Sequence, residues 1–263
     1  MTIVVFMVAG MSSRFGGNPK QMAIVGPKGE TLIEYSVNQA LENKFKKLVF
    51  ITNPKTEYLF KNIFGNKYRD VEVLYVEQKY DTKTRTRPWG TADAISHLLP
   101  VINDNFIMVN GDDIYGSDTF KTGFEMMNDT NNNIIGGLKV IDTLPESGYV
   151  NRGVIFVKDK QVSGLKEMLN INKKDNKELY NELANMNFIG LQYETLKEIS
   201  TLVNLFKKEH SNEKKLECIL TDILDYLIKE KGMKMDFFEI KNKIIGITNP
   251  GHEIKLKKQL QDL

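Results

Sequence analysis

The sequence of 263 residues has few of the side chains that build disulfide frameworks and metal clusters. A single cysteine, Cys218, excludes an intramolecular disulfide and a cysteine-built zinc site. The three histidines, His97, His210 and His252, lack the spacing of metal ligands or of a catalytic triad. No serine stands in a Gly-x-Ser-x-Gly context, so hydrolase chemistry has no support. One cysteine fits a reducing compartment, and we expect the protein to be cytoplasmic.

Long hydrophobic runs and an excess of charge of one sign are also absent. No stretch approaches the ~18 apolar residues that cross a bilayer, so no membrane association is expected. The apolar N-terminus, 1–9, has no basic region before it and is typical of a strand, not of a signal peptide. The 36 basic and 34 acidic residues leave a net charge of +2, which is too balanced to indicate a nucleic-acid partner.

Apolar runs and helical patterns alternate through the first half of the chain. The expected strands are 2–8, 47–52, 71–76 and 105–110. Three helices are expected: the first begins at the capping box Thr31-Leu-Ile-Glu34, and the other two cover 56–64 and 90–99. This alternation predicts an α/β fold with a mostly parallel, doubly wound, Rossmann-like mixed sheet flanked by helices. Right-handed crossovers put the ends of the first and fourth strands at one carboxyl edge, where ligands bind.

The second half is less regular. We expect paired strands at 134–141 and 149–158, a helix at 162–169 and a strand at 186–191. Helices at 195–209 and 216–229, short strands at 235–240 and 243–247, and a final helix follow. The helix at 216–229 is expected to bury one stripe of side chains: Leu216, Ile219, Ile223, Tyr226 and Leu227. No internal repeat or linker is present, so 1–263 is expected to form a single domain. Its halves are about 1–130 and a smaller lobe of about 131–263.

The segment Gly10–Gln21 leaves the first strand and suits a bound triphosphate. Glycines let backbone N–H groups approach an anion, and Ser12 and Ser13 add hydroxyl donors. Arg14 and Lys20 bring two positive charges to the same segment. The segment is neither a Walker A loop nor a dinucleotide fingerprint, because the Gly-Lys-Ser/Thr ending and the G-x-G-x-x-G pattern are missing. A solvated surface loop is the alternative.

Several ordered segments resemble the sugar-nucleotide pyrophosphorylases, members of the nucleotidyltransferase superfamily with a GT-A-like fold. They are Ala9-Gly10-x-Ser12-Ser13-Arg14, Pro19-Lys20-Gln21, Pro88-Trp89-Gly90-Thr91-Ala92, Asn110-Gly111-Asp112-Asp113, Met186-Asn187-Phe188-x-Gly190 and Gly246-Ile247-Thr248. The likeness is greatest to a branch that opens with MxAGMxSRxGG…KQ. It implies that 1–130 binds the nucleotide and 131–263 binds the sugar phosphate.

The resemblance implies that Arg14 and Lys20 are catalytic. Arg14 would hold the β- and γ-phosphates, and Lys20 would reach the α-phosphate. The implied nucleotide-binding residues are Ala9, Gly10, Met11, Ser12, Ser13, Gln78, Gly90, Thr91 and Asp112. Between Gln78 and Gly90, the basic stretch 79–87 is either a lid over the phosphates or a solvated loop.

Asp112 follows a strand and a glycine, so it is expected at the carboxyl edge beside the loop. One carboxylate together with phosphates and water is an adequate set of Mg²⁺ ligands, and we favour Asp112 over Asp113. The alternative is a turn or helix-capping aspartate. Family members commonly have a second ligand late in the chain, where this sequence has Thr248 or Asn249, neither of them a carboxylate.

On the acceptor side, the resemblance implies sugar contacts by Gly148, Glu167 and Asn187, although Glu167 could be an ordinary helix carboxylate. The cation that meets the acceptor phosphate stays open among Arg152, Lys173 and Lys174.

The implied reaction joins a nucleoside triphosphate to a sugar 1-phosphate and releases pyrophosphate, with Mg²⁺ as cofactor. UTP and N-acetylglucosamine 1-phosphate, giving UDP-N-acetylglucosamine, are the preferred substrates. A thymidylyl- or cytidylyltransferase on another sugar phosphate is the first alternative. A glycosyltransferase would not need Arg14 and Lys20, and a non-catalytic nucleotide-sugar-binding regulatory subunit would not be expected to keep them together with Asp112. The oligomeric state stays open.

Overall fold

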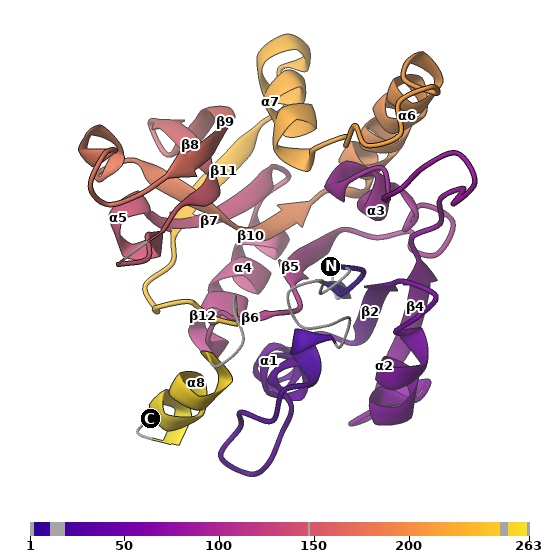
Figure 1. The fold of residues 1–263 in the computed structure, drawn as a ribbon, viewed down its shortest axis with the longest axis vertical. Helices are drawn as coiled ribbons and strands as arrows, with labels where there is room; N and C mark the ends of the chain where they lie inside the picture. The colour runs from indigo at the N-terminus through magenta and orange to yellow at the C-terminus, as the bar shows by residue number, and fades with distance from the viewer. Residues whose placement is uncertain (1–2, 11–18, 147, 248–251, 262–263) are drawn as a thin grey trace. The chain divides into compact units, whose positions relative to one another are not determined.

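The computed structural model describes residues 3–10, 19–146, 148–247 and 252–261 (Figure 1). Contacts divide the chain into two compact units, each treated separately below. The first unit comprises 1–79, 106–125 and 242–263, and the second comprises 80–105 and 126–241. Both units are therefore discontinuous in sequence, whereas the functional halves expected from the motifs meet near residue 130. That functional division stays a prediction.

The first unit contains the parallel sheet that the alternating pattern predicts. Its strands lie in the order β3 (Lys67–Tyr68), β4 (Val71–Glu77), β2 (Lys47–Thr52), β1 (Ile3–Met7) and β5 (Phe106–Asn110). All pairs are parallel except β3 with β4. The β1 residues from Ile3 to Phe6 are at most 2% exposed, because helices and loops cover both faces of a parallel sheet.

Aromatic side chains fill much of the first unit's core. The ring of Phe6 on β1 lies 5.9 Å from that of Phe50 on β2, and Phe50 packs against Phe60 and Phe64 of α2 (Glu57–Phe64). Phe6 also contacts Phe120, at the start of α4 (Ser117–Asp129). Such contacts hold the strands in register, so that their carboxyl ends form a defined edge.

Helix α1 (Leu32–Leu41) begins where the sequence predicts. Thr31 is its N-cap, and the Thr31 hydroxyl and the Glu34 carboxylate form the expected capping box. The Ser36 hydroxyl donates to the carbonyl oxygen of Asp113 at 3.1 Å, in the short strand β6 (Asp113–Ile114). Helix α1 therefore supports the segment that carries Asp112.

The second unit has a mixed, mainly antiparallel sheet. Its strands are β10 (Leu183–Leu191), β7 (Asn133–Lys139), β11 (Met235–Glu239), β9 (Gln161–Ile171) and β8 (Val150–Lys158) in that order, and β10 also pairs with β8. Only β7 and β11 are parallel to each other. The expected strands at 134–141 and 149–158 are present, but the prediction that they pair with each other is wrong, because β7 pairs with β10 and β11.

The predicted helix at 162–169 is also wrong, since this segment is strand β9. Asp159 and Lys160 both have positive φ, 52° and 64°, between the paired residues Lys158 and Gln161. This is the backbone of a two-residue hairpin turn that reverses the chain into β9. Glu167 therefore lies on a strand and not on a helix.

The second unit also contains α3 (Thr91–Ser96), α5 (Val140–Thr143), α6 (Tyr193–Glu209) and α7 (Leu220–Lys231). Helix α6 begins at Tyr193, just ahead of the predicted start at 195, and its N-cap Gln192 makes no side-chain cap bond. The stripe predicted for 216–229 is partly wrong: Leu216 and Tyr226 are 40% and 41% exposed. Because α7 begins at 220, its buried residues are Leu220, Thr221, Leu224 and Leu227. No helix in the described ranges is long and apolar enough to cross a membrane.

Candidate active site

In the first unit, the ends of β1 and β5 place the candidate catalytic groups. The backbone N–H of Gly111, just after β5, donates to the carbonyl of Met7 at 3.0 Å. A Cβ atom at Gly111 would collide with the Val8 side chain, so only glycine allows the two strand ends to approach this closely. The chain then turns and presents Asp112 at the carboxyl edge of the parallel sheet.

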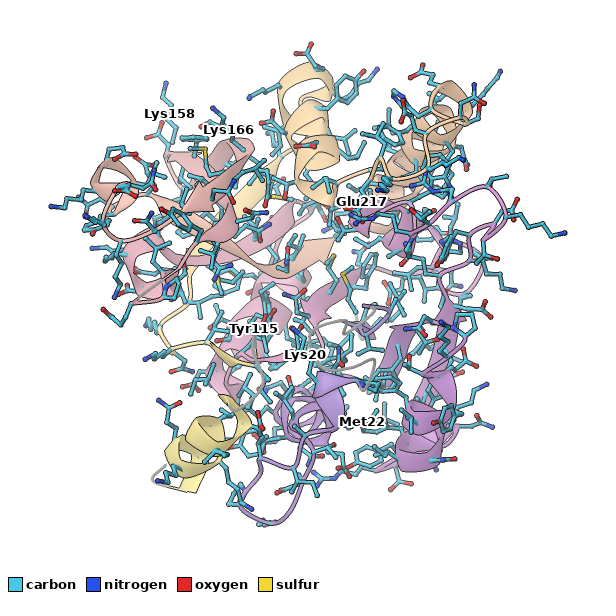
Figure 2. The ribbon with its side chains drawn as sticks, viewed as in Figure 1. Lys20, Met22, Tyr115, Lys158, Lys166 and Glu217 are labelled. Atoms are coloured by element: carbon cyan, nitrogen blue, oxygen red, sulfur yellow. The ribbon has the colours of Figure 1, made fainter. Side chains whose placement is uncertain are left out.

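Lys20, which is labelled in Figure 2, forms an ion pair with Asp112. Lys20 lies in a short 3-10 turn, η2 (Lys20–Met22), after the glycine-rich segment. Both side chains are 23% exposed, so the pair is partly shielded and still reachable from solvent. The fold thus brings together two residues that are 92 positions apart in the sequence, at the predicted carboxyl edge of the parallel sheet.

The neighbouring carboxylate, Asp113, has a different environment. Its Oδ2 accepts from Asn110 Nδ2 at 3.0 Å, and its backbone pairs with Gly246 of β12 (Ile245–Gly246). A Cβ atom at Gly246 would meet Asp113 Oδ1, so the carboxylate packs directly on this glycine. Asp113 therefore holds the turn together, which favours Asp112 as the metal ligand.

The late segment of the chain reaches the same place. The N–H of Ile247 donates to the carbonyl of Asp112 at 3.3 Å. Thr248 and Asn249, the candidates for the second metal ligand, follow directly in sequence but lie outside the described residues. Their identity as ligands stays a prediction.

The candidate phosphate-binding segment, 10–21, is described only at its two ends. The carbonyl of Ala9 accepts from Asn53 Nδ2 at 3.0 Å, and a Cβ atom at Gly10 would meet nothing within 4 Å. The candidates Met11, Ser12, Ser13 and Arg14 lie outside the described residues.

Gln78 follows β4 at the same edge of the first unit's sheet. Its backbone N–H donates to the carbonyl of Thr52 at 2.9 Å, and the residue is 6% exposed. The position at a strand's carboxyl end fits a residue that hydrogen-bonds a base, although its burial leaves little of the side chain accessible.

In the second unit, Gly90 and Thr91 pack against the segment before α7. Gly90 has a φ of +103°, and a Cβ atom there would lie 2.6 Å from the carbonyl oxygen of Cys218. The Thr91 hydroxyl accepts from the N–H of Leu220 at 2.9 Å. The glycine is therefore required by this close approach, whatever else it contacts. Cys218 is 2% exposed, and burial, with Asp93 and Asp222 nearby, raises its thiol pKa to about 11.

The basic stretch 79–87 contains a buried cation that the sequence pattern does not reveal. Arg85 is only 3% exposed, and its guanidinium donates to backbone carbonyls and lies over the Trp89 ring at 3.4 Å. Lys83 is exposed. Neither a lid nor a fully solvated loop describes Arg85, and only the position of the Pro-Trp-Gly sequence just after it could have hinted at an anchor.

Glu167 lies near Gly153 of β8, Thr221 of α7 and Asn185 of β10. A Cβ atom at Gly153 would lie 3.4 Å from Glu167 Oε2 and from Thr221 Oγ1, and 3.3 Å from Asn185 Cβ. Burial, and then the neighbouring Asp222 carboxylate, raise the pKa of Glu167, while Arg152 opposes them. Glu167, which the resemblance implies as a sugar contact, therefore lies close to Thr221 and Asn185. The sequence analysis did not identify these two residues as candidates.

Asn187 is tied to this group through Asn185. The N–H of Asn187 donates to Asn185 Oδ1 at 2.8 Å, and Asn187 has a φ of +57°, at an irregularity of β10 between 185 and 188. Irregular strand positions re-aim side chains and are common beside active sites. Gly148 has a φ of +90°, with nothing within 4 Å of a Cβ position. No described contact joins it to Glu167 or Asn187.

Two candidates for the acceptor-phosphate cation have partners. Arg152 Nη2 donates to the carbonyl of Thr143 at 3.0 Å, and Lys173 forms an ion pair with Glu146. Neither contact points to a phosphate. This assignment therefore stays open.

The donor set fits magnesium better than a transition metal. Among the described residues, no group of three or more His, Cys, Asp or Glu side chains could hold a metal by itself. A single accessible carboxylate beside a candidate phosphate loop suits a hard cation that takes its other ligands from phosphate and water. Asp112 is the residue that would hold it.

A family model called nucleotidyl transferase matches residues 15–242. The chain belongs to the nucleotidyl transferase family. That span includes Lys20, Asp112, Glu167 and Asn187, and the family assignment agrees with the resemblance found in the sequence motifs. Among curated proteins, none matches this sequence.

Solved structures share the whole fold. The inositol-1-phosphate CTP transferase from T. maritima is 16% identical, with a TM-score of 0.69 over 100% of this chain and 97% of that one. A Bacillus anthracis protein described as a glucose-1-phosphate thymidylyltransferase is 16% identical, with a TM-score of 0.73 over 99% and 95%. A UDP-glucose pyrophosphorylase complexed with UDP-glucose is 18% identical, with a TM-score of 0.69 over 100% and 99%. At these identities the likeness establishes the fold of the nucleotidyl transferase chain.

Proposed function

We propose that this nucleotidyl transferase joins a nucleoside triphosphate to a sugar 1-phosphate and releases pyrophosphate. The observation that carries the proposal is the Lys20–Asp112 pair at the carboxyl edge of the parallel sheet, directly after the glycine-rich segment. Ligands of open α/β sheets bind at this edge. A partly shielded cation and carboxylate there suit a nucleotide's phosphates and their counter-ion.

In the proposed reaction, a phosphate oxygen of the acceptor attacks the α-phosphorus in line, and pyrophosphate leaves. The protein needs no covalent nucleophile, because positioning and neutralisation of negative charge supply the catalysis. Lys20 would stabilise the charge that develops on the α-phosphate. Arg14, by resemblance, would hold the β- and γ-phosphates and assist the leaving group.

Mg²⁺, when bound, would neutralise the triphosphate and help to orient it. Asp112 is the proposed ligand, because Asp113 is engaged with Asn110 and Gly246. With Asp112 holding the ion, Lys20 would be available for the phosphate, so the two residues would have separate roles.

The acceptor is proposed to be N-acetylglucosamine 1-phosphate, and the nucleotide UTP. Glu167 and Asn187 supply carboxylate and amide groups for sugar hydroxyls or an acyl group, and Glu167 lies beside Thr221 and Asn185. The choice of UTP rests on resemblance in the sequence. The related structures do not select one nucleotide, because they are described as a CTP transferase, a thymidylyltransferase and a UDP-glucose pyrophosphorylase. A thymidylyl- or cytidylyltransferase on another sugar phosphate is the runner-up.

Pyrophosphate release tests the proposal. Each nucleoside triphosphate is crossed with a panel of sugar 1-phosphates in the presence of Mg²⁺, with Asp112→Asn as the inactive variant and Lys28→Ala, an exposed cation of the same region, as the matched control. We expect pyrophosphate with one pair, no release after chelation, and at least a hundredfold loss in Asp112→Asn. No release across the whole panel would refute the proposal. Release of nucleoside diphosphate from a nucleotide sugar would then favour a glycosyltransferase.

A further inference from the structure

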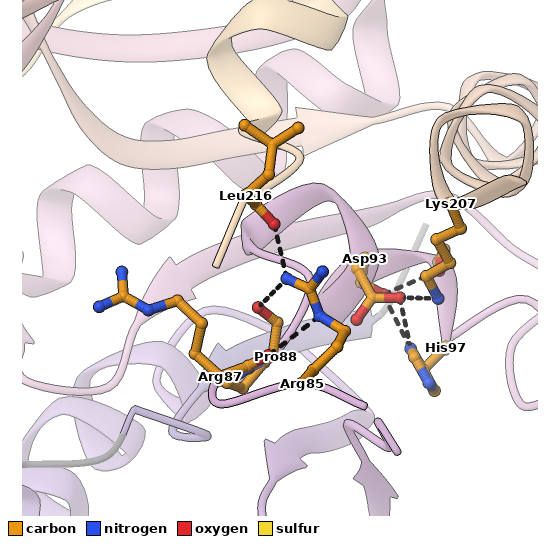
Figure 3. A network of polar contacts seen from close by, with 8 residues as sticks. Arg85, Arg87, Pro88, Asp93, His97, Lys207 and Leu216 are labelled. Carbon is orange, nitrogen blue, oxygen red and sulfur yellow. Dashed lines mark hydrogen bonds and ion pairs between the residues drawn. The ribbon is translucent and has the colours of Figure 1, made fainter. Parts of the chain in front are cut away.

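Arg85 is a buried cation whose described hydrogen bonds all go to neutral backbone groups. Its Nε donates to the carbonyl of Arg87 at 3.2 Å, and its Nη2 donates to Leu216 at 2.6 Å and to Pro88 at 3.5 Å (Figure 3). Nη1 donates to the carbonyl of Glu213. One planar guanidinium thus fixes carbonyls from two segments, 87–88 and 213–216, that are far apart in sequence.

Trp89 completes this anchor. The Arg85 guanidinium carbon lies 3.4 Å from the centre of the Trp89 ring, a cation–π arrangement. The same ring meets Phe206 of α6 edge-on, with the centroids 6.2 Å apart. Both the backbone and the aromatic ring of 85–89 are therefore held in one geometry.

Backbone bonds continue the contact beyond Arg85. The N–H of Thr86 donates to Lys214 at 3.2 Å, that of Cys218 to Trp89 at 2.6 Å, and that of Ala92 to Cys218 at 3.1 Å. Gly90 lies within this run, where a side chain would collide with the Cys218 backbone. The position of Gly90 and Thr91 is therefore set by how firmly 85–92 is fastened to 213–220.

Helix α3, which begins at Thr91, is held by separate contacts. Asp93, which has no exposed surface, forms an ion pair with Lys207 of α6, and its carbonyl lies 2.8 Å from His97 Nδ1 (Figure 3). Helix α7 is also fastened independently, because Asp225 Oδ1 accepts from the N–H of Leu165 on β9 at 2.8 Å. Loss of Arg85 should therefore loosen 85–92 but leave α7 in place against β9, the strand that carries Glu167.

Stability alone is a poor reason to bury this residue. Burial lowers the pKa of the Arg85 guanidinium, which reflects the cost of removing the cation from water. An apolar side chain of similar size often stabilises a core as well as a buried charge does. What an apolar residue lacks is the planar set of N–H donors that fixes several carbonyls at once.

We propose that Arg85 is a positioning residue for nucleotide binding, which holds Gly90 and Thr91 in place by joining 87–91 to 213–218. The inference rests on the proposed function and on the resemblance in the sequence, which implies that Gly90 and Thr91 bind the nucleotide. Arg85 itself is buried and acts through the backbone, so it is not a catalytic residue. The acceptor side should be insensitive to it.

The test compares Arg85→Met, which keeps bulk without donors, and Arg85→Lys, which keeps charge without the planar fork. Lys215→Ala is the matched control, since this exposed lysine belongs to the same 213–220 segment. Amide hydrogen exchange of 86–92 and 213–220 is measured in each full-length protein. We expect exchange on the order of tenfold faster in Arg85→Met, an intermediate rise in Arg85→Lys, and no change in Lys215→Ala or at Leu165.

Steady-state kinetics provides the readout that a purely structural role would not produce. In Arg85→Met, the KM for the nucleotide should rise on the order of tenfold, while the KM for the sugar phosphate stays within about twofold. Unchanged exchange, an unchanged nucleotide KM, or an equal rise in both KM values overturns the inference.

Calorimetric titration with each Mg²⁺-nucleotide separates this inference from the proposed function. A wild-type protein that binds a nucleotide without releasing pyrophosphate refutes the proposed function alone, and weaker nucleotide binding by Arg85→Met then still supports the inference. Equal binding by wild type and Arg85→Met, or no binding by the wild type, overturns it.

Discussion

Lys20 has two possible partners, the Asp112 carboxylate that it meets in the structure and the α-phosphate of a bound nucleotide. If it acts mainly in the transition state, Lys20→Ala should cost on the order of 2.7–4 kcal/mol of activation free energy, about 10²–10³ in kcat. The KM for the nucleotide should change little. Initial-rate measurements of pyrophosphate release check this, with Lys28→Ala as the control for loss of one charge. A near-normal kcat would remove Lys20 from the catalytic residues.

Glu167 should show opposite effects on stability and binding. Its pKa is raised from 4.5 by burial first and then by Asp222, so the folded protein favours the protonated carboxyl. The ionised form therefore costs stability above the folded-state pKa, and this cost vanishes below pH 4.5, where the carboxyl is protonated in both states.

Glu167→Gln, which is neutral at every pH, is thus expected to raise Tm at pH 8 and to have no effect near pH 3.5. Thermal unfolding over this pH range measures the difference. The same substitution should raise the KM for the sugar phosphate, because the proposed carboxylate contact is lost. A gain in Tm of the same size at both pH values would show that ionisation is not its cause.

At the scale of elements, the contact between Gly90 and the segment before α7 predicts a large penalty for one methyl group. Gly90→Ala places a Cβ atom 2.6 Å from the Cys218 carbonyl oxygen, at a φ of +103°. Overpacking alone should lower the free energy of unfolding by about 1–3 kcal/mol. Gly29→Ala is the matched control, because Gly29 has a φ of +84° with nothing within 4 Å. Equal losses in urea unfolding would mean that backbone strain, and not the collision, decides the cost.

Cys218 reports on the same contact. Burial raises the pKa of the Cys218 thiol to about 11, so the reactive thiolate is scarce at pH 8, and the side chain is only 2% exposed. Native protein should therefore resist alkylation by iodoacetamide, whereas protein in urea should react fully. Mass spectrometry of the labelled protein measures both. Rapid native labelling would mean that 213–220 opens easily from 85–92.

The elements that were predicted correctly have local causes. The capping box at Thr31 forms as the sequence indicates, and the continuous apolar runs became buried strands. Strand β9 was missed because Val162, Leu165 and Leu169 also fit a helical spacing, while the turn at Asp159-Lys160 has no glycine or asparagine to reveal its positive φ values. The segment forms a strand because it pairs with β8 and β11, and the pattern of residues within 161–171 does not reveal this pairing.

The site shows the same division between local and distant causes. Asp112 could be placed at the edge because one strand and one glycine precede it, and Lys20 because it follows the first strand. The neighbours of Glu167, by contrast, come from β8, β10 and α7, and two of the hydrogen-bond partners of Arg85 come from 213–216. Only tertiary pairing brings such residues together, so no spacing in the sequence predicts them.

At the scale of the whole chain, the first unit is completed by its last residues. Helix α8 (His252–Gln261) contributes Leu256 and Leu260 to a buried cluster with Val25, Leu32 and Ile114. Leu32 begins α1, and Val25 follows the turn that carries Lys20. Packing by the C-terminal helix therefore supports the segment that carries the candidate catalytic lysine.

Leu256→Ala is expected to destabilise the first unit. The side chain is 1% exposed, and removal of a buried leucine costs about 2–5 kcal/mol through lost burial and the cavity left behind. Ile254→Ala on the same helix is the matched control, since Ile254 is 64% exposed and should cost little. Urea unfolding measures both variants. Because the cavity would lie against Leu32 and Val25, pyrophosphate release by Leu256→Ala should also decline at temperatures below its Tm, whereas similar stabilities for the two variants would show that α8 does not support the site.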